Sequence, residues 1–530
     1  MDQQKFVEEI KNPRTYNKDT KKVKLIQTHI SFVTLTGKYA YKIKKPVNFG
    51  FLDFSTLEKR KYFCNRELSL NKRLCPEIYE SVVKITKKDD GLEIDGDGKI
   101  IDYAVKMKEF SQDKIMTNLL HTEKINEETI DKIVDNLVSF YNKIKSNDEI
   151  KRFGEIKTIK QNTDENFEQT KEVIGKTIDK EKFDFIKKIT NRFLERNKNV
   201  FGRRIKNDYI KDCHGDLHTG NIVIKNNQIC IFDCIEFNKR FRYSDLASDI
   251  GFLAMDLDFQ GRPYLGSYLI KKYVEKSNDS GIYDVLNFYK AYRAYVRGKV
   301  IGFKLSDSHI EEKEKSNTVR TSRKYFNLAY YYMLLVSREM DEKKKPIVFV
   351  TSGLTGTGKT TVANKVSVDY NAIRISTDEV RKEMMGIDKY ERHFEPYNTG
   401  IYSPKKMREI YIRVIEKGKE YLQNNRNVVL DATFKTKELR KKARDIADEI
   451  NSCFLILNTV APEECVKKYL EKRVEKKSVS DGRWEIYEKQ KDTFEYLNSD
   501  EKFVTIDISK DSFEYQMGAF RDIYNSICEG

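Results

Sequence analysis

The sequence is poor in cysteine, proline and tryptophan, with 8, 8 and 1 of these residues in a chain of 530. No Cys-x2-Cys pair occurs, so the chain lacks the ligand spacing of a zinc site and the density of a disulfide scaffold. Cys230 and Cys234 flank Asp233, but a strand would point their side chains away from a shared tetrahedral site. We therefore expect buried thiols and neither zinc nor disulfides.

Long apolar runs are also missing. No stretch approaches the ~20 consecutive apolar residues of a membrane span. The first ten residues have the pattern of an acidic amphipathic helix and not that of a signal peptide. We therefore expect a cytoplasmic protein with no membrane partner. At 530 residues the chain exceeds one ordinary domain, and its hydrophobic content of 39% is sufficient for globular folding.

The net charge of +16 is unevenly distributed. Residues 346–530 carry 32 basic and 31 acidic side chains, whereas the first 345 residues carry 67 and 52. A diffuse lysine excess of this kind is typical of solvated helix faces more than of a binding patch. Nucleic acid is therefore not the favoured partner, although it stays open as an alternative.

A polar loop motif near the middle of the chain carries the first chemistry. It runs from His214 to Asn221 and is followed by Asp233 at the end of an apolar run. Phosphoryl transfer of the kinase type needs a carboxylate to orient the acceptor hydroxyl, and an amide and a second carboxylate to hold Mg²⁺. Asp216 fits the catalytic role, and Asn221 and Asp233 fit the metal-binding roles. The alternative is an ordinary turn and a strand-end cap. The motif resembles the catalytic loop of aminoglycoside phosphotransferases.

Upstream residues supply the phosphate-binding part of such a site. Two strand-like stretches, 23–35 and 39–44, predict a hairpin of a small lobe. Lys42 fits the lysine that neutralises the nucleotide phosphates, and Glu67, on a following helix, fits the glutamate that holds it. Lys44 shares the strand face of Lys42 and is either a second phosphate contact or solvated. No G-x-G-x-x-G loop precedes Lys42, and Thr28–Ser31 stands in its place.

Further candidates follow the catalytic loop. Asp245 lies in a segment that resembles the one in which these kinases brace the loop with an Asp, and Asp249 is the alternate. Arg293 and Arg297 are four residues apart and share one face of a predicted helix. They are candidates for binding an anionic substrate, or they pair with an acidic residue of 256–258.

A charged stretch at 341–345 ends in Pro346 and predicts a domain boundary. The buried strand predicted at 347–352 leads into a complete G-x-x-x-x-G-K-[ST] motif, followed at once by a helical pattern. Backbone N–H groups of such a loop wrap the phosphates, Lys359 reaches the terminal phosphates, and the Thr360 hydroxyl binds Mg²⁺. The expected ATP-binding residues are Gly353, Thr355, Gly356, Thr357, Gly358, Lys359, Thr360 and Thr361.

Two further strands of this region end in carboxylates, at Asp378 and at Asp431. Ligands of open α/β sheets bind at the carboxyl ends of the strands. Asp431 fits a metal ligand. The region resembles the polynucleotide-kinase, gluconate-kinase and zeta-toxin group, which implies that Asp378 activates the acceptor, Arg381 contacts substrate and Arg473 belongs to a catalytic lid. The second basic lid position is Lys476 or Lys477, a departure from that group, and Asp378 is alternatively a helix cap.

Taken together, the motifs resemble bifunctional bacterial and archaeal proteins in which an aminoglycoside phosphotransferase-like domain precedes a P-loop ATP-binding domain. The most specific segments are 42–60 and 243–258. The resemblance implies an α+β bilobal kinase-like domain followed by an α/β P-loop domain with a parallel sheet. The expected domains are a small lobe at 1–110, a large lobe at 111–340, a linker at 341–345 and a P-loop kinase at 346–530.

We therefore expect a tandem phosphotransferase that transfers a phosphoryl group from ATP or GTP, with Mg²⁺, to an alcohol group. The expected acceptors are small polar metabolites or nucleotide-like molecules. The alternative is an ATP-driven regulator or an RNA-end-modifying protein, with one catalytic and one nucleotide-sensing site. Neither acceptor nor the oligomeric state follows from the sequence.

Overall fold

A computed structural model describes residues 3–16, 18–88, 91–122, 124–225, 228–306, 310–386, 399–474, 482–510 and 512–528. The chain divides into two compact units. The first comprises Met1–Glu165, Leu194–Asp256 and Lys272–Ile282, and the second Asn166–Phe193, Leu257–Lys271 and Tyr283–Gly530. Among the described residues, no helix is long and apolar enough to cross a membrane. The domain boundaries expected from the sequence stay a prediction.

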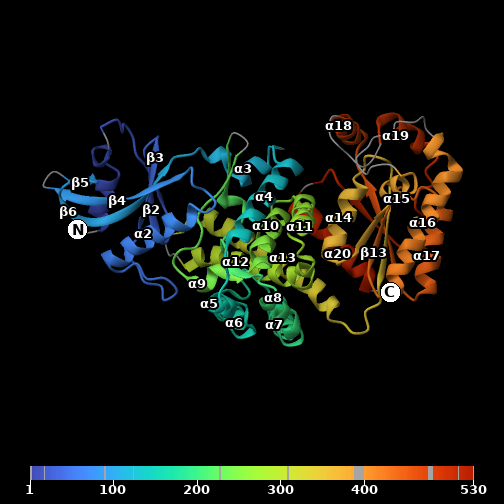
Figure 1. Ribbon diagram of the computed structural model, residues 1–530, viewed down its shortest axis with the longest axis horizontal. Coiled ribbons are helices and arrows are strands. Elements are labelled where there is room, and N and C mark those ends of the chain that lie inside the picture. The colour runs from blue at the N-terminus through green and yellow to red at the C-terminus, as the bar shows by residue number, and fades with distance from the viewer. Residues whose placement is uncertain are drawn as a thin grey trace. The chain divides into compact units, whose positions relative to one another are not determined.

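The first unit contains a six-stranded antiparallel sheet with the order β1-β2-β3-β6-β4-β5 (Figure 1). Its strands are β1 Lys24–Gln27, β2 Ser31–Leu35, β3 Tyr39–Lys44, β4 Tyr79–Lys88, β5 Gly91–Ile94 and β6 Lys99–Lys108. The first predicted strand is thus two strands, because a turn at Thr28–Ser31 interrupts it. Successive side chains of a strand alternate between faces, so Lys42 and Lys44 share one. Helix α2, Leu57–Asn71, packs against β6 and β4 and carries Glu67.

Two short two-stranded sheets hold the catalytic loop of the first unit. Strand β7, Ile210–Asp212, pairs with β10, Tyr243–Asp245, and β8, Ile222–Lys225, pairs with β9, Gln228–Ile231. The loop connects β7 to β8, and Asp233 follows β9 in a left-handed conformation with φ of 63°. The remaining helices up to residue 277 are α1 Gln3–Ile10, α3 Met116–Leu120, α4 Glu127–Lys143, α5 Asp148–Lys151, α6 Ile156–Thr170, α7 Lys180–Arg196, α8 Lys198–Lys206, α9 Lys239–Arg242, α10 Leu246–Phe259 and α11 Pro263–Ser277.

One pair of cysteines corrects the expectation of thiols alone. Cys75, which follows α2, and Cys230, in β9, form a disulfide with their Cα atoms 4.7 Å apart. The two residues are 155 positions apart in the chain, and no spacing motif links them. Cys64, Cys213 and Cys234 are buried free thiols, as expected.

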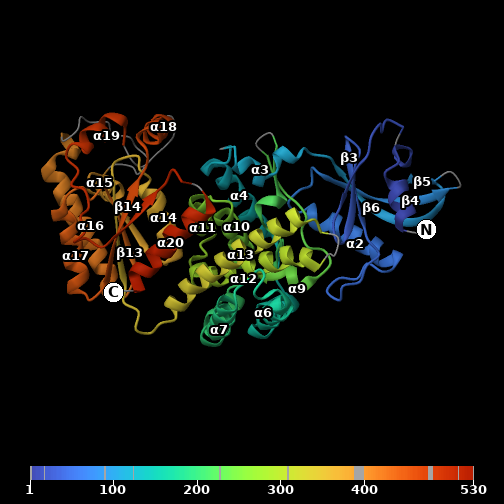
Figure 2. The same ribbon diagram turned by 180° about the vertical axis from the view of Figure 1, so that it is seen from behind.

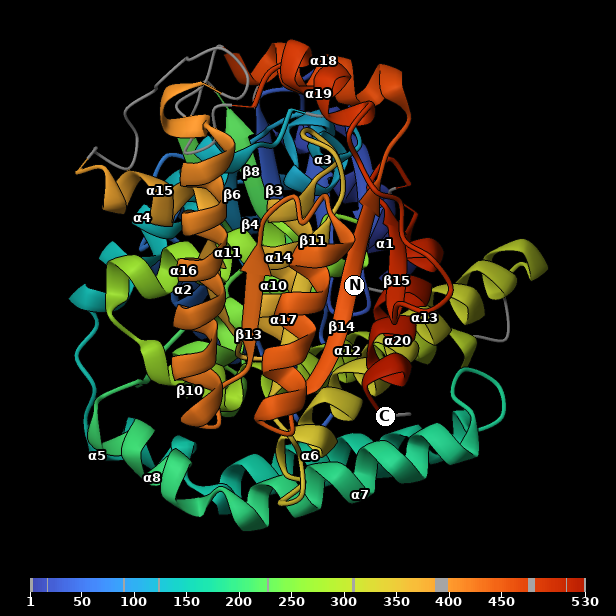
Figure 3. The ribbon, with the colours of Figure 1, turned by 90° about the vertical axis from the view of Figure 1, so that its right-hand side faces the viewer.

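The second unit contains the predicted parallel sheet, which has five strands in the order β12-β13-β11-β14-β15 (Figure 3). Its strands are β11 Ile347–Ser352, β12 Ile373–Ser376, β13 Val428–Asp431, β14 Cys453–Val460 and β15 Phe503–Asp507. The central strand β11 is buried along its whole length, which explains its unbroken apolar sequence. Figures 1 and 2 show α14 and α20 on one face of the sheet and α16 and α17 on the other. The helices are α14 Lys359–Asp369, α15 Thr377–Met384, α16 Pro404–Gln423, α17 Lys437–Glu449, α18 Glu463–Val474, α19 Trp484–Lys491 and α20 Phe513–Cys528.

Helices α12, Tyr283–Gly302, and α13, Glu312–Glu339, belong to the same compact unit as the parallel sheet. A buried charge cluster joins them to α14. Asp258 accepts hydrogen bonds from Lys290 at 2.7 Å, Tyr332 at 2.5 Å and Lys365 at 3.4 Å, and Lys365 also contacts Asp369 at 2.6 Å. Buried lysines and aspartates at these distances neutralise one another, so the helix after the P-loop is anchored to α12 and α13.

Candidate active sites

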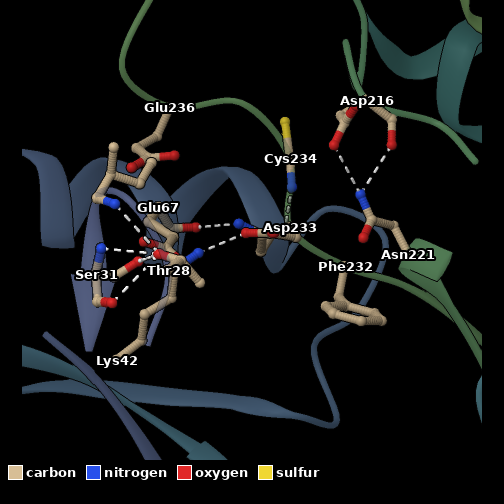
Figure 4. Close-up of polar contacts among 12 residues, drawn as sticks. Thr28, Ser31, Lys42, Glu67, Asp216, Asn221, Phe232, Asp233, Cys234 and Glu236 are labelled. Atoms are coloured by element: carbon tan, nitrogen blue, oxygen red, sulfur yellow. Dashed lines mark hydrogen bonds and ion pairs between the residues drawn. The ribbon is translucent and has the colours of Figure 1, made fainter. Parts of the chain in front are cut away.

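The catalytic loop places the predicted base and one predicted metal ligand in direct contact. Asn221 donates hydrogen bonds from its side-chain amide to the backbone carbonyl and to Oδ2 of Asp216, both at 3.0 Å (Figure 4). The Asp216 side chain is 34% exposed, so its carboxylate can be reached by a substrate. With its nitrogen committed to Asp216, Asn221 keeps its Oδ1 as an acceptor.

Asp249 braces this loop, and Asp245, the first candidate, does not. Asp249 accepts hydrogen bonds from the backbone N–H groups of His214 at 2.7 Å and Gly215 at 2.9 Å. Asp245 instead binds the buried guanidinium of Arg204, at 2.5 and 2.7 Å. Both aspartates lie in the predicted segment, and only the folded loop distinguishes them. The alternate assignment is therefore the correct one.

His214 ties the loop to the segment that leads into Asp233. Its Nδ1 accepts the backbone N–H of Asp216 at 3.3 Å, and its Nε2 contacts the carbonyl of Phe232 at 3.0 Å. Burial lowers the pKa of His214, and this outweighs the acidic groups around it. A neutral ring with its proton on Nε2 satisfies both contacts. His214 is thus a structural link, and Asp216 is left as the ionisable group that faces solvent.

Lys42 lies between Glu67, its predicted partner, and Asp233, the predicted metal ligand. Its Nζ is 2.9 Å from Oε1 of Glu67 and 2.5 Å from Oδ1 of Asp233 (Figure 4). Burial lowers the pKa of Lys42, but the carboxylates of Asp233 and Glu67 outweigh it, and the pKa is raised. Lys42 is therefore held as a cation, the state that phosphate binding requires.

The structure adds Glu236 to this group, and it shows that Lys44, predicted as a second phosphate contact or a solvated side chain, is not solvated. Lys44 is 2% exposed and donates to Oε2 of Glu67 at 2.7 Å and to Glu236. The shared strand face of Lys42 and Lys44 is a usable signal, whereas nothing in the sequence marked Glu236. Two lysines and two glutamates thus form one buried network, in which each charge has an opposite neighbour.

The oxygen-rich ligands beside Lys42 suit a hard cation. Asp233 has a side chain that is 42% exposed, and the amide oxygen of Asn221 is not used by the bond to Asp216. Mg²⁺ prefers carboxylate and carbonyl oxygens and keeps several of its waters. The two predicted metal residues therefore fit Mg²⁺.

The turn between β1 and β2 is the segment that the sequence places where other kinases have a glycine-rich loop. Thr28 Oγ1 accepts the backbone N–H of Ser31 in this turn at 2.9 Å.

The P-loop connects β11 to α14 as its motif predicts. Gly353, Gly356 and Gly358 have φ of 145°, 80° and 82°, in the left-handed region that glycine favours. A Cβ on Gly353 would lie 2.4 Å from the carbonyl oxygen of Thr459, so the close approach of these backbones also requires glycine. Lys359 bends back over the loop and donates to the Leu354 carbonyl at 2.7 Å.

A cavity of about 460 Å³ opens beside this loop. Its lining brings together Asp378, Arg381 and Asp431 with six of the eight predicted ATP-binding residues, namely Thr355, Gly356, Gly358, Lys359, Thr360 and Thr361. The other two predicted residues, Gly353 and Thr357, contact Thr459. The motif and the ends of β12 and β13 therefore meet in one cavity.

Asp378 does not have the role of a helix cap. The N-cap of α15 is Ser376, whose hydroxyl accepts the backbone N–H of Asp378 at 3.2 Å. Asp378 pairs with Arg381 at 2.9 Å, and the guanidinium of Arg381 lies 4.5 Å from the centre of the Tyr402 ring. The carboxylate thus faces the cavity with its charge balanced by the predicted substrate-binding arginine.

Arg374 is a further residue of this site that sequence reasoning missed. It lies in β12 and donates to Asp431 at 2.5 Å and to Glu379 at 2.7 Å. Burial lowers the pKa of Arg374, but Asp431 and Glu379 outweigh this and raise it. Arg374 therefore holds one oxygen of the predicted metal carboxylate and leaves the other for a hydrated Mg²⁺. Its position within a strand pattern gave no sign of this contact.

The roles predicted for Arg293, Arg297 and Arg473 stay predictions. Arg293 and Arg297 lie in α12 of the second compact unit, whereas Asp216 lies in the first. Arg293 packs over Tyr292, and Arg297 over Tyr325, with 5.5 and 5.7 Å between charge and ring centre. The backbone of Arg473 lies in the last turn of helix α18, and its side chain lies outside the described residues, as do Lys476 and Lys477.

Comparison with known proteins agrees with the assignment of the P-loop region. A protein family described as AAA domain matches residues 348–497. Two relatives, Uncharacterized protein Mb2027c of Mycobacterium bovis and Uncharacterized protein Rv2004c of Mycobacterium tuberculosis, are each 28% identical over 429 residues, which cover 81% of this chain and 82% of theirs.

Similar solved structures include two kinases that overlap more than half of the chain. Aminoglycoside 2'-phosphotransferase-IIIa with GDP is 12% identical, covers 58% of this chain and 94% of its own, and has a TM-score of 0.37. Choline kinase from Cryptosporidium parvum is 14% identical, with 61% and 91% covered and a TM-score of 0.36. A gluconokinase from Sinorhizobium meliloti is 16% identical, with 35% and 94% covered and a TM-score of 0.25.

Proposed function

We propose that the chain is a tandem ATP-dependent phosphotransferase whose two sites each act on an alcohol group. The observation that carries the proposal is the arrangement of Lys42, Glu67 and Asp233 beside Asp216 and Asn221. A lysine held as a cation, a metal carboxylate and a reachable base are what phosphoryl transfer needs from a protein. The P-loop cavity supplies a second set of phosphate-binding, metal-binding and acceptor-orienting side chains.

At the kinase-like site, Lys42 binds the phosphates and Glu67 keeps its ammonium in place. Asp216 accepts the proton of the acceptor hydroxyl as the oxygen forms its bond to the γ-phosphorus and the bond to the β-phosphate oxygen breaks. Asn221 orients Asp216 through its amide nitrogen. Mg²⁺, held by Asp233 and Asn221, would neutralise charge on the phosphate oxygens.

In the P-loop cavity, the backbone of the loop and Lys359 bind the phosphates, and Thr360 and Asp431 fit the metal. Asp378 orients the acceptor hydroxyl, and Arg381 contacts the acceptor. A simple nucleotide-binding site has no use for a further carboxylate and arginine one helical turn apart in the lining of the same cavity. This pair therefore favours transfer over hydrolysis alone. Both reactions draw on ATP and Mg²⁺, which are plentiful in the cytoplasm, the proposed location.

A phosphorylation screen tests the proposal. Full-length protein is incubated with a metabolite extract and [γ-³²P]ATP, in parallel with Asp216→Asn, Lys359→Ala and the double variant. We expect labelled products that separate into two sets, one lost with Asp216→Asn and the other with Lys359→Ala. Labelled products that persist in the double variant, or no transfer to any hydroxyl compound by the parent protein, would contradict the proposal.

A further inference from the structure

Four phenylalanine side chains form a cluster beside the kinase-like site, and nothing in the phosphate chemistry uses them. The aromatic cluster consists of Phe49, Phe51, Phe237 and Phe241, all in the first compact unit. Phe49 and Phe51 follow Lys44 by five and seven residues, and Phe237 follows Asp233 by four. Two segments of the catalytic machinery thus each contribute aromatic rings to one place.

Specific backbone and ring contacts hold the aromatic cluster together. The Phe49 and Phe51 rings are stacked at 24° with centroids 6.1 Å apart, on either side of Gly50, whose φ of 78° forms the tip of a small hairpin. Phe51 packs on Phe237 and Phe241 at 6.2 and 6.3 Å. Phe51 therefore has a structural role, because its ring packs against two other rings of the cluster.

Phe49 is different, because 49% of its surface is exposed, and Phe51 beneath it is 40% exposed. Because about half of the Phe49 ring stays in contact with water, its burial contributes little to the free energy of folding. Contiguous exposed apolar surface next to a catalytic centre is typical of a ligand-binding site. The exposed ring of Phe49 offers a flat apolar face, on which another planar ring can stack.

The cluster lies against the loop that carries the base. The backbone N–H of Ile235 donates to the carbonyl of His214 at 3.2 Å, and a Cβ on Gly215 would lie 2.8 Å from the carbonyl oxygen of Phe241. The segment 235–241 is therefore packed onto the two residues before Asp216. A molecule stacked on the cluster is within reach of the catalytic loop.

The charges next to the cluster decide which ring-bearing ligand fits. Lys239 pairs with Glu149 at 2.9 Å, and Arg240 pairs with Glu165 at 2.6 Å. The nearby cations are thus balanced by acids, and the surface favours neither a polyanion nor a polycation.

From this, and resting on the proposed function of the Asp216 site, we infer that its acceptor is an uncharged hydroxyl compound with a planar aromatic ring, as in a nucleoside. The ring stacks on Phe49 and Phe51, and the hydroxyl faces Asp216. The products are ADP and the phosphate monoester, with the hydroxyl proton taken by Asp216.

Binding of adenosine and ribose to the full-length protein tests the inference, with both nucleotide sites saturated by a non-hydrolysable ATP analogue. Adenosine carries the planar ring and ribose does not. We expect Phe49→Ala to weaken adenosine binding about tenfold, the scale of one lost stacking contact. Phe49→Trp should restore it, and Tyr421→Ala, which removes a ring 41% exposed on α16, should have no effect.

Adenosine binding that Phe49→Ala leaves unchanged, no adenosine binding at all, or ribose binding as tight as that of adenosine would each overturn the inference. Phosphate transfer is scored separately. Adenosine that binds through Phe49 but accepts no phosphate from the protein with an intact Asp216 would count against the proposed function and leave the aromatic subsite in place.

Discussion

Lys42 Nζ lies 2.5 Å from Oδ1 of Asp233, so the predicted phosphate-binding cation and the predicted metal-binding carboxylate are paired with each other. Bound nucleotide and metal would separate this pair. A negatively charged phosphate would then take the place of Asp233 beside Lys42, and the positively charged metal would take the place of Lys42 beside Asp233. The carboxylate of Asp233 thus helps to keep Lys42 charged before substrate arrives, because it raises the pKa of the lysine. Glu67 remains as the second partner of Lys42 throughout.

This pairing predicts the effect of Lys42→Ala. In the Lys359→Ala background, which silences the P-loop cavity, we expect Lys42→Ala to weaken ATP binding by at least tenfold, because the phosphates lose their buried cation. Lys38→Ala, in the turn between β2 and β3, is the matched control and should bind ATP normally. Equal ATP affinity in both variants, measured by calorimetry, would remove Lys42 from the nucleotide site.

Glu236→Gln tests the network that the sequence did not reveal. The substitution leaves Lys44 buried with one carboxylate instead of two, and we expect a loss of about 3 kcal/mol in the free energy of unfolding of the first unit. Glu77→Gln, at an exposed position, should change it by less than ~0.5 kcal/mol. The measurement is the melting temperature of each variant by differential scanning calorimetry. Matching melting temperatures for the two variants would show that the Lys44–Glu236 contact adds nothing.

Asp378→Asn separates catalysis from helix capping in the P-loop cavity. Because Ser376 caps α15, the substitution should leave the helix intact. We expect phosphate transfer by this site to fall by roughly 10²–10⁴-fold with ATP affinity nearly unchanged, the usual weight of a positioned acid–base group. Ser376→Ala is the converse control, with a loss of ~1 kcal/mol in stability and a smaller loss of transfer. Undiminished transfer in Asp378→Asn would rule out the acceptor-orienting role.

Glu339, at the end of α13, predicts a pH dependence of stability. Burial raises its pKa to about 7 from 4.5, and the nearby Lys344 only partly offsets this. The folded protein therefore binds this proton more tightly than the unfolded chain does. Below pH 4.5 both states are protonated and the group costs nothing. As the pH rises towards 7 the unfolded carboxyl ionises first, and stability falls by about 3 kcal/mol in total.

Glu339→Gln removes this titration and keeps an oxygen for the hydrogen bond from Asn287, which is 3.3 Å long. We expect the variant to melt at a higher temperature than the parent at pH 8 and at nearly the same temperature at pH 5. Glu420→Gln, on the exposed side of α16, should show no such difference. If the melting temperatures of Glu339→Gln and the parent differed by the same amount at pH 5 and at pH 8, the stability of the parent would not depend on the titration of Glu339.

Motifs of a few residues were enough to predict both phosphate-handling sets. The P-loop needs glycine at positions where φ is positive, and the His214–Asn221 loop must present its side chains within one tight turn. Because both requirements concern residues that are neighbours in the chain, they can be recognised in the sequence. Two strands of the parallel sheet follow the same logic, since β12 and β13 end in Ser376 and Asp431, which line the cavity. The fold class predicted from these patterns is confirmed, with β1–β6 antiparallel and β11–β15 parallel.

The missed residues are those whose partners are distant in the chain. Lys44 and Glu236 are 192 positions apart, Arg374 and Asp431 are 57 apart, and Cys75 and Cys230 are 155 apart. The choice between Asp245 and Asp249 is of the same kind, because both have the right spacing and only the packing of the loop decides which one meets its N–H groups. Local backbone demands can be read from neighbouring residues, whereas the pairing of buried charges is decided by tertiary packing, which brings opposite charges together wherever the chain supplies them.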